Sequence, residues 1–220
     1  MGSVHWSLVV PLKPLALAKS RLAATSGGVM RPQFALAFAL DTVAAALACA
    51  AVRDVAVVTD DPLASAELAG VGARVVPDSP GAGLNAALAH GANTVRAVRP
   101  EAAVAALNAD LPALRPAELA RVLASAAQFP RAFLADASGI GTTFLAAAPG
   151  VELLPAFGGR SRDRHLLSGA VEIELEGVES LRRDVDTGDD LRAALALGVG
   201  PRTAARCATA AVSLPSPGVA

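Results

Sequence analysis

The stretch Ala103-Val-Ala-Ala-Leu-Asn-Ala-Asp-Leu-Pro112 begins with a short, unbroken apolar run, and an asparagine, an aspartate and a Leu-Pro turn follow it. A strand without polar alternation is buried on both faces, which is typical of a parallel sheet covered by helices. Outward from this run, other short apolar runs alternate with longer amphipathic ones up to about Ala135. The alternation predicts β-α-β units and a doubly wound parallel sheet.

The expected strands are short runs of Val, Ala and Leu, at residues 6–10, 55–59, 73–76, 103–108, 131–135, 142–148 and 171–175. The expected helices have a longer amphipathic period, at residues 31–50, 63–69, 84–98, 116–128, 162–167 and 189–197. After Ala135 the pattern is irregular and strand-rich, which predicts an antiparallel, substrate-binding portion. The fold class is therefore α/β, with a Rossmann-like, mostly parallel central sheet in one domain over residues 1–202. Residues 203–220, rich in Ala, Ser and Pro, are expected to form an extended or flexible tail.

The composition excludes several classes of function. The formal net charge is −1 and no basic stripe occurs, so nucleic acid is not an expected partner. Cys49 and Cys207 are too few and too isolated for a disulfide framework or a zinc site, and Cys49 is expected in the core. Neither a signal peptide nor a membrane-spanning run is recognised, and a soluble cytoplasmic protein without membrane contact is expected.

The only two lysines, Lys13 and Lys19, lie with Arg21 in one short segment after the first expected strand, whereas the other 17 basic residues are arginines. A lysine head is a compact, flexible point charge, and an arginine head is a planar fork. A pair of lysines at this place favours the binding of an oligophosphate. The alternative is a solvated loop whose lysines have no special role.

Asp110 directly follows the expected strand at 103–108. Ligands of open α/β sheets bind beyond the carboxyl ends of the strands, so this carboxylate is expected to face a ligand. The alternative is an aspartate that only caps the helix beginning at Pro116.

Asp184 and Asp186 share one face if their segment is extended. Crowded carboxylates need a cation, and hard oxygen ligands beside phosphates favour Mg²⁺. Thr187 followed by Asp189 or Asp190 resembles a helix start, so at least one of these later acids is expected to be a cap.

Other motifs are weaker. Asp60 and Asp61 would suit a ribose, but the G-x-G-x-x-G of a dinucleotide site is missing after the first strand, and no P-loop motif occurs. Glycine-bearing stretches at 138–143 and 157–165 can present backbone N–H groups and hydroxyls to an anion. Each alone is equally typical of an ordinary turn.

Taken together, these segments resemble the guanylyltransferases of deazaflavin coenzyme (F-420) biosynthesis, which join GTP to 2-phospho-L-lactate or phosphoenolpyruvate. The resemblance runs from about residue 7 to residue 203. Its motifs are Val10-Pro-Leu-Lys-Pro, Ala18-Lys-Ser-Arg-Leu22, Gly83-Leu-Asn-Ala-Ala, Asp110-Leu-Pro, Gly141-Thr142, Phe157-Gly158 with Ser161 and His165, and Asp184-Val-Asp186-Thr. The chain departs from the family pattern at Ala109, where Gly is common, and at Ile140, where many members carry Thr.

The resemblance implies a single-domain nucleotidyltransferase fold and a transfer of GMP that releases pyrophosphate. It assigns Mg²⁺ to Asp110 and Asp184, with Asp186 close by. The residues that it assigns to the phosphorylated three-carbon acid are Thr142, Gly158 and Ser161. The residues that it assigns to GTP are Lys13, Lys19 and Arg21 at the phosphates, and Asn85 near the base or ribose.

Several alternatives stay open at this point. The acceptor acid could be phosphoenolpyruvate, 2-phospho-L-lactate or a phosphoglycerate, and a further partner would be a downstream transferase of the same pathway. A related Mg²⁺-dependent nucleotidyltransferase acting on a sugar phosphate or molybdopterin would share the fold. A non-catalytic nucleotide-binding module is the third alternative, which the combination of two lysines, Asp110 and Asp184 disfavours.

Overall fold

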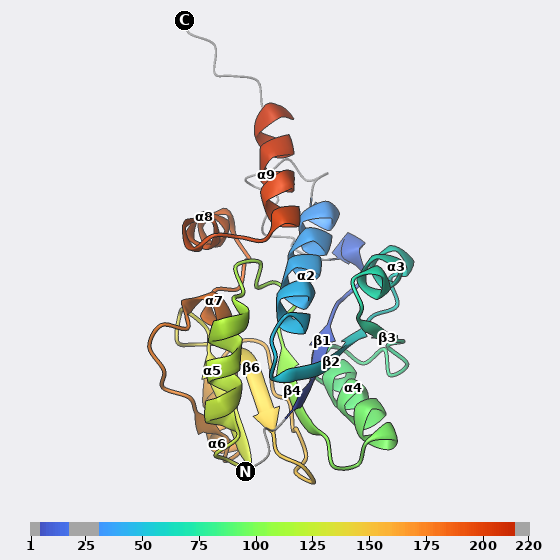
Figure 1. The fold of residues 1–220 in the computed structure, drawn as a ribbon, viewed down its shortest axis with the longest axis vertical. Helices are drawn as coiled ribbons and strands as arrows, with labels where there is room; N and C mark the ends of the chain where they lie inside the picture. Colours follow the sequence, from blue (N-terminus) through green and yellow to red (C-terminus); the bar gives the residue numbers. More distant parts are fainter. Residues whose placement is uncertain (1–4, 18–30, 214–220) are drawn as a thin grey trace, which may run out of the picture.

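A computed structural model describes residues 5–17 and 31–213 of the chain. The strands and helices alternate around one sheet (Figure 1). The strands are β1 Trp6–Pro11, β2 Val52–Val58, β3 Arg74–Val76, β4 Ala103–Leu107, β5 Arg131–Ala135, β6 Thr142–Ala147 and β7 Val171–Glu172. The helices are the 3₁₀ turn η1 Leu15–Leu17, α2 Arg31–Leu47, α3 Pro62–Gly70, α4 Leu84–Val98, α5 Pro116–Ala126, α6 Ser161–Leu167, α7 Glu179–Arg182, α8 Gly188–Leu197 and α9 Pro201–Ser213. Every expected strand and helix is present.

The seven strands form one mixed sheet in the order β3-β2-β1-β4-β6-β5-β7. Strands β3, β2, β1 and β4 are parallel, as the β-α-β pattern predicts. Strand β6 lies between β4 and β5 and is antiparallel to both. The reversal arises because the short loop 136–141 joins β5 to β6 as a hairpin, whereas parallel strands need a long crossover. The single reversed strand confirms a mostly parallel sheet with an antiparallel portion.

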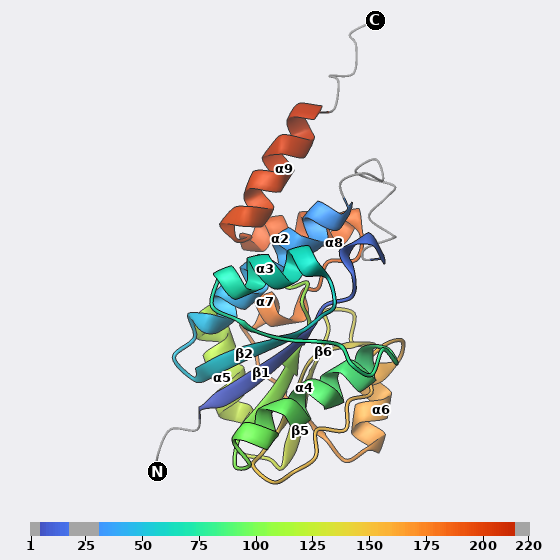
Figure 2. The ribbon, with the colours of Figure 1, turned by 90° about the vertical axis from the view of Figure 1, so that its right-hand side faces the viewer.

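Helices cover both faces of the sheet (Figures 1 and 2). Side chains alternate along β1, so that Leu8 and Val10 join one core cluster and Val9 joins the other. The first cluster includes residues of α2, α3, α5 and α7, and the second includes residues of α4. At Gly91 of α4 an added Cβ would lie 2.5 Å from a methyl group of Val9, so glycine permits the close approach of α4 to the sheet.

The C-terminal segment corrects one expectation, because residues 201–213 form helix α9 instead of an extended end. Asp41 of α2, 4% exposed, accepts the N–H groups of Arg202 and Thr203 at 3.2 and 2.8 Å. A buried carboxylate that satisfies the first N–H groups of a helix favours its formation. Alanine, which is frequent in this segment, has the highest helix propensity. The division of the chain at residue 202 stays a prediction.

The residue just before helix α9 contacts the turn that follows β4. The N–H of Gly200 donates to the carbonyl of Pro112 at 2.8 Å. An added Cβ at Gly200 would lie 2.3 Å from the carboxyl carbon of Asp41, so only glycine fits there. The helix then projects away from the sheet, beside α2 (Figures 1 and 2).

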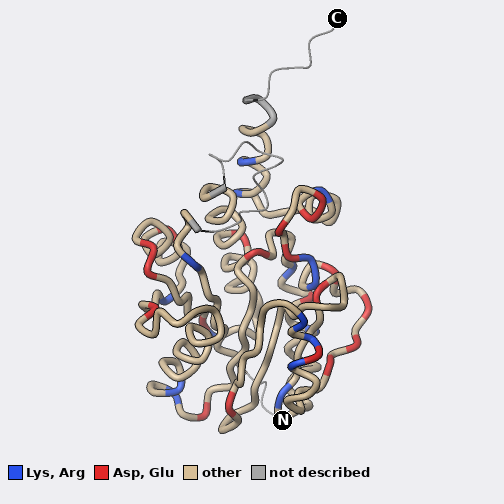
Figure 3. Tube along the Cα trace, turned by 180° about the vertical axis from the view of Figure 1, so that it is seen from behind, with Lys and Arg blue, Asp and Glu red and all other residues tan. Residues whose placement is uncertain are grey.

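Along the described chain, Lys and Arg positions are interspersed with Asp and Glu positions (Figure 3). Cys49 is 2% exposed, which confirms its predicted place in the core, and it is a free cysteine like Cys207. Among the helices of residues 5–17 and 31–213, none combines the length and the apolar character needed to cross a membrane.

Candidate active site

Asp110 lies in the turn directly after β4, at the carboxyl end of that strand. The antiparallel pairing of β4 with β6 continues into this turn, where the N–H of Asn108 donates to the carbonyl of Thr143 at 3.0 Å. Because β6 runs in the opposite direction, its first residue, Thr142, comes to the same edge of the sheet. The reversed strand therefore brings Asp110 and Thr142 to one side of the molecule.

The turn around Asp110 is fixed by Thr42 of α2. The buried hydroxyl of Thr42 accepts the N–H of Leu111 at 3.0 Å and donates to the carbonyl of Phe38 at 2.8 Å. The carbonyl of Ala109 lies 3.3 Å from the same hydroxyl. A buried N–H without an acceptor costs about 1–3 kcal/mol, so this contact favours one conformation of the turn.

Asp184 is brought to Asp110 by a backbone hydrogen bond. The N–H of Val185, which is fully buried, donates to the carbonyl of Asp110 at 3.0 Å. Both aspartates are half-buried, and Asp186 is exposed. The two carboxylate-bearing segments therefore lie side by side, as a shared metal and phosphate site requires.

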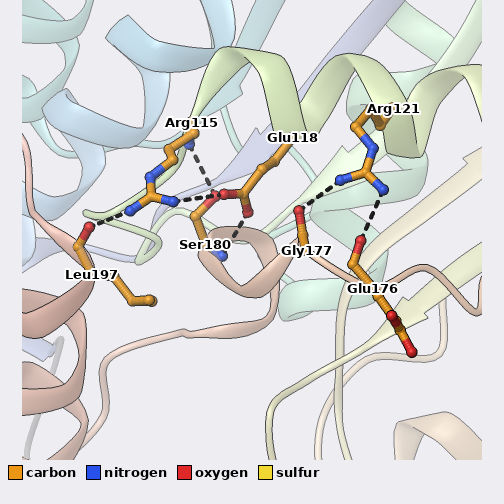
Figure 4. A network of polar contacts seen from close by, with 7 residues as sticks. All are labelled: Arg115, Glu118, Arg121, Glu176, Gly177, Ser180 and Leu197. Carbon is orange, nitrogen blue, oxygen red and sulfur yellow. Dashed lines mark hydrogen bonds and ion pairs between the residues drawn. The ribbon is translucent and has the colours of Figure 1, made fainter.

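The segment that leads to Asp184 is anchored on helix α5. The residues of this network are Arg115, Glu118, Arg121, Glu176, Gly177, Ser180 and Leu197 (Figure 4). Glu118, 8% exposed, accepts the N–H of Ser180 at 2.9 Å and pairs with Arg115 at 3.0 Å. Arg121 donates to the carbonyls of residues 176 and 177, both at 2.8 Å. These contacts hold the chain before Asp184 in place.

A cavity of about 280 Å³ adjoins Asp184. Its lining residues are Asp136, Ala137, Ser138, Arg183, Asp184, Asp186, Thr187 and Asp190. Asp190 accepts the N–H and the hydroxyl of Thr187 at 2.9 and 2.7 Å, in the capping box of α8. This confirms the predicted helix start, with Thr187 as the N-cap residue and Asp190 as the acid that completes the capping box. Asp136 accepts the N–H of Ile140 at 3.0 Å and shapes the hairpin loop 136–141.

Lys13 is exposed in the loop after β1, at the carboxyl end of that strand. The N–H of Leu12 donates to β2, and the N–H of Leu15 donates to the carboxylate of Asp61 at 2.9 Å. Asp61 also caps α3 by accepting the N–H of Ala64 at 3.0 Å. Burial opposes the ionisation of Asp61, but the backbone N–H groups outweigh burial and lower its pKa. Asp61 thus anchors the lysine loop and the first turn of α3.

A second group of side chains surrounds His165 of α6, which is fully buried. Its Nδ1 lies 2.9 Å from the hydroxyl of Thr142, and its Nε2 accepts the N–H of Ala156 at 3.0 Å. Its ring lies 5.2 Å from the ring of Phe157 and 5.5 Å from that of Phe133. His165 therefore joins β6, the loop 148–160 and α6.

The residues predicted to bind the acid lie around this histidine. Thr142 contacts it directly, Gly158 follows its neighbour Phe157, and Ser161 precedes it by one turn of α6. Thr142 and Ser161 are 5% and 1% exposed, whereas Gly158 is exposed. The structure thus brings these three residues to one place, next to the loop 136–141.

Asn85 lies in the first turn of α4 and holds the loop 148–160 with its amide. Its Oδ1 accepts the N–H of Phe157 at 2.8 Å, and its Nδ2 donates to the carbonyl of the same residue at 3.1 Å. Arg164 donates to the carbonyl of Ala156 at 3.0 Å and to that of Gly158. The predicted contact of Asn85 with the base or ribose stays a prediction, since both of its amide groups bind Phe157 here.

Comparison with known proteins places the chain among nucleotidyltransferases. Residues 36–176 match the MobA-like NTP transferase domain. A protein of Streptomyces avermitilis named phosphoenolpyruvate guanylyltransferase is 71% identical over 97% of this chain and 98% of its own length. A protein of the same name from Thermomonospora curvata is 65% identical over 94% of this chain and 90% of its own length. The chain belongs to the phosphoenolpyruvate guanylyltransferase family.

Solved structures agree with this guanylyltransferase family at the level of the fold. A nucleotidyl transferase from Methanothermobacter superposes with a TM-score of 0.61 at 25% identity, over 88% of this chain and 97% of that one. A Mycobacterium tuberculosis protein solved in complex with manganese has a TM-score of 0.52 at 22% identity, over 89% of this chain and 100% of that one. The guanylyltransferase is accordingly an α/β nucleotidyltransferase with a single central sheet.

The donor set of this guanylyltransferase fits a hard divalent cation. Asp110 and Asp184 carry oxygen ligands on two segments that a backbone hydrogen bond joins, and Mg²⁺ is commonly bound by one or two carboxylates, with phosphates and water as further ligands. Among the described residues, no group of three or more His, Cys, Asp and Glu side chains gathers as a metal site. A pair of carboxylates with substrate phosphates does not need such a group. The predicted Lys19 and Arg21 lie outside the described residues.

Three roles were missed by sequence reasoning: Thr42 as the anchor of the Asp110 turn, Asn85 as a clamp on Phe157, and His165 as the partner of Thr142. Each depends on a contact between residues far apart in the chain. The sequence carries no motif signal for Thr42, whereas Asn85 stands in the motif Gly83-Leu-Asn-Ala-Ala and His165 stands in a motif beside Ser161. The spacing of His165 from other polar residues in the sequence matches no metal site and no catalytic triad. Its contact with Thr142 is visible only in the folded chain.

Proposed function

We propose that the protein transfers GMP from GTP to phosphoenolpyruvate and releases pyrophosphate. One observation carries this proposal: the reversed strand β6 puts Thr142 at the sheet edge where Asp110 meets Asp184. An acid held near Thr142 would therefore lie next to a nucleotide held near the carboxylates. The names of the relatives from Streptomyces avermitilis and Thermomonospora curvata support the choice of both substrates.

In the proposed complex, Asp110 and Asp184 hold Mg²⁺, with Asp186 nearby. The cation would neutralise phosphate charge and orient the reacting groups. Lys13, Lys19 and Arg21 bind the phosphates of GTP, and Asn85 lies near the base or ribose.

The acid occupies the pocket formed by Thr142, Gly158 and Ser161. A phosphate oxygen of the acid attacks the α-phosphorus of GTP. A new P–O bond forms as the bond to the pyrophosphate oxygen breaks, and the pair of electrons leaves with pyrophosphate. The attacking oxygen is already anionic, so the reaction needs alignment and charge neutralisation more than a general base. The pocket agrees with this requirement, because its buried histidine, His165, is neutral and is not needed as a general base.

A second acceptor, 2-phospho-L-lactate, differs from phosphoenolpyruvate by the reduction of one double bond and would fit the same carboxylate and phosphate contacts. A nucleotidyltransferase acting on a sugar phosphate or molybdopterin shares the fold but usually carries a glycine-rich loop after the first strand. The anchored Leu12-Lys13-Pro14 segment does not supply one. We further propose that the product enters coenzyme F-420 biosynthesis in the cytoplasm, where a downstream transferase takes it up.

The test is to incubate the purified protein with Mg²⁺, GTP and each acid in turn: phosphoenolpyruvate, 2-phospho-L-lactate and 3-phosphoglycerate. Pyrophosphate release would be followed continuously, and the product would be identified by mass. The proposal expects the highest kcat/KM with phosphoenolpyruvate and no release without Mg²⁺. Release with a sugar phosphate but with none of the acids would contradict it.

A further inference from the structure

The bond between His165 and Thr142 has a direction that the remaining contacts of His165 determine. The backbone N–H of Ala156 can only donate, so Nε2 of His165 accepts it through a lone pair. In a neutral imidazole the other nitrogen then carries the hydrogen. Nδ1 is therefore the donor of the 2.9 Å bond, and the hydroxyl oxygen of Thr142 is the acceptor.

The surroundings of the ring keep His165 in this neutral form. The side chain is fully buried between the rings of Phe133 and Phe157. Burial, together with the positive charges of Arg131 and Arg164, lowers the pKa of His165 to about 4. A doubly protonated ring would also lose the acceptor that the N–H of Ala156 needs.

The hydroxyl of Thr142 is thus left with its own hydrogen to donate. Within the described part of the chain, His165 is the only hydrogen-bond partner of this hydroxyl. Thr142 is the first residue of β6, at the sheet edge next to the Asp110 turn. A ligand that reaches Thr142 therefore meets a hydroxyl that offers a hydrogen.

We propose that His165 is a positioning residue that fixes Thr142 as a hydrogen-bond donor, and so selects an acceptor substrate with an anionic oxygen at this point. The inference rests on the proposed function and deepens it, because it names the part of the acid that Thr142 recognises: a carboxylate or phosphate oxygen. Such oxygens accept hydrogen bonds and donate none at neutral pH. A neutral group at the same position of the substrate, such as an amide nitrogen or an ester oxygen, binds more weakly.

The kinetic test is a double-mutant cycle with Thr142→Val, His165→Leu and the double variant. A hydrogen bond to a charged group corresponds to about a tenfold or larger change in affinity. Each single variant is expected to raise KM for phosphoenolpyruvate about tenfold or more, with KM for GTP changed less than about threefold. The double variant is expected to be no worse than the poorer single variant, since both remove one interaction. Thr142→Ser, which keeps the hydroxyl, is expected to recover most of the affinity for the acid.

A matched control is Thr94→Val, which removes a threonine hydroxyl bonded to the carbonyl of His90 within α4. It is expected to leave both KM values unchanged. A second readout needs no catalysis and no change at residue 165: the imidazole ¹⁵N shifts of the wild-type protein. These are expected to show Nδ1 protonated and Nε2 unprotonated at neutral pH. The opposite tautomer would overturn the inference, whatever the variants do.

The outcomes separate the inference from the function on which it rests. If the wild-type protein releases no pyrophosphate with any of the acids, the proposed function and the inference both fall. If the wild-type protein is active but the variants raise both KM values alike, or if their effects are additive, the inference alone falls. Because Thr142→Ser and the ¹⁵N shifts do not depend on His165→Leu, an unfolded His165→Leu variant still leaves a decisive result.

Discussion

The backbone N–H of Val185 lies 3.0 Å from the carbonyl oxygen of Asp110. This one bond joins the turn after β4 to the segment before α8. It brings the segments that carry the carboxylates at 110 and 184 side by side. In the proposed complex both carboxylates bind the cation that arrives with the nucleotide.

The first prediction concerns this pair. Asp110→Asn and Asp184→Asn each keep the size of the side chain but remove a charge, so turnover is expected to fall at least about a hundredfold, a loss typical of a missing electrostatic contact to the transition state. The measurement is kcat at saturating GTP and Mg²⁺, with a thermal unfolding curve for each variant. Asp189→Asn is the matched control, since Asp189 is exposed and pairs with Arg192 on α8. Near-normal turnover of either variant would refute the assignment to Mg²⁺.

The second prediction tests the anchor of the turn. Thr42→Val keeps the shape of the side chain but leaves the buried N–H of Leu111 without its acceptor. The free energy of unfolding is expected to fall by about 1–3 kcal/mol. The Mg²⁺ concentration for half-maximal activity is expected to rise, because Asp110 becomes less well positioned. Thr42→Ser retains the acceptor and should resemble the wild type in both urea unfolding and Mg²⁺ titration. An equal loss in both variants would show that the methyl group, and not the hydroxyl, matters.

The third prediction concerns the lysine loop. Lys13→Ala is expected to raise KM for GTP about tenfold or more, the size of a lost charge-assisted hydrogen bond, while KM for the acid changes little. Lys13→Arg should recover only part of the affinity, because a planar fork replaces a compact charge. Arg53→Ala removes an exposed cation of β2 and serves as the control. Unaltered GTP affinity in Lys13→Ala would contradict the role of this lysine.

The fourth prediction follows from the pKa of His165, which is about 4 in the folded protein and about 6.5 in an unfolded chain. Between these values the unfolded chain binds a proton that the folded one does not, so this contribution to stability is complete above pH 6.5 and is lost as the pH falls toward 4. The free energy of unfolding is expected to fall by about 3 kcal/mol over this pH range because of His165. Urea unfolding at pH 7.5 and at pH 4.5 measures this loss in the free energy of unfolding. His165→Asn should be less stable at pH 7.5 and should lose less stability on acidification. Equal losses in both proteins would contradict the buried, neutral state.

Much of the fold could be predicted because its strands are local patterns. The run 103–107, for example, is apolar without alternation, and it ends where the polar Asn108 begins. Helix α7 was missed because its four residues are too few to show a period. Helix α9 was misjudged because its stability depends on Asp41, a partner far away in the sequence.

The site was predictable to the extent that it follows from strand ends. Asp110 follows β4, and the rule that ligands bind beyond the carboxyl ends of strands was enough to single it out. The contact of Val185 with Asp110, and the tautomer of His165, depend on how distant segments dock. No spacing in the sequence encodes either of them.

The docking of helix α9 has a practical consequence for where the enzyme can be shortened. A chain that ends before Gly200 would lack the two N–H groups that donate to Asp41. It would also lack the N–H that donates to the carbonyl of Pro112, two residues after Asp110. A cut at the end of the matched domain, after residue 176, would discard the carboxylate at 184 as well. Helix α9 therefore supports the turn that carries Asp110. We expect shortened chains to bind Mg²⁺ weakly and to have low turnover, even where they still fold.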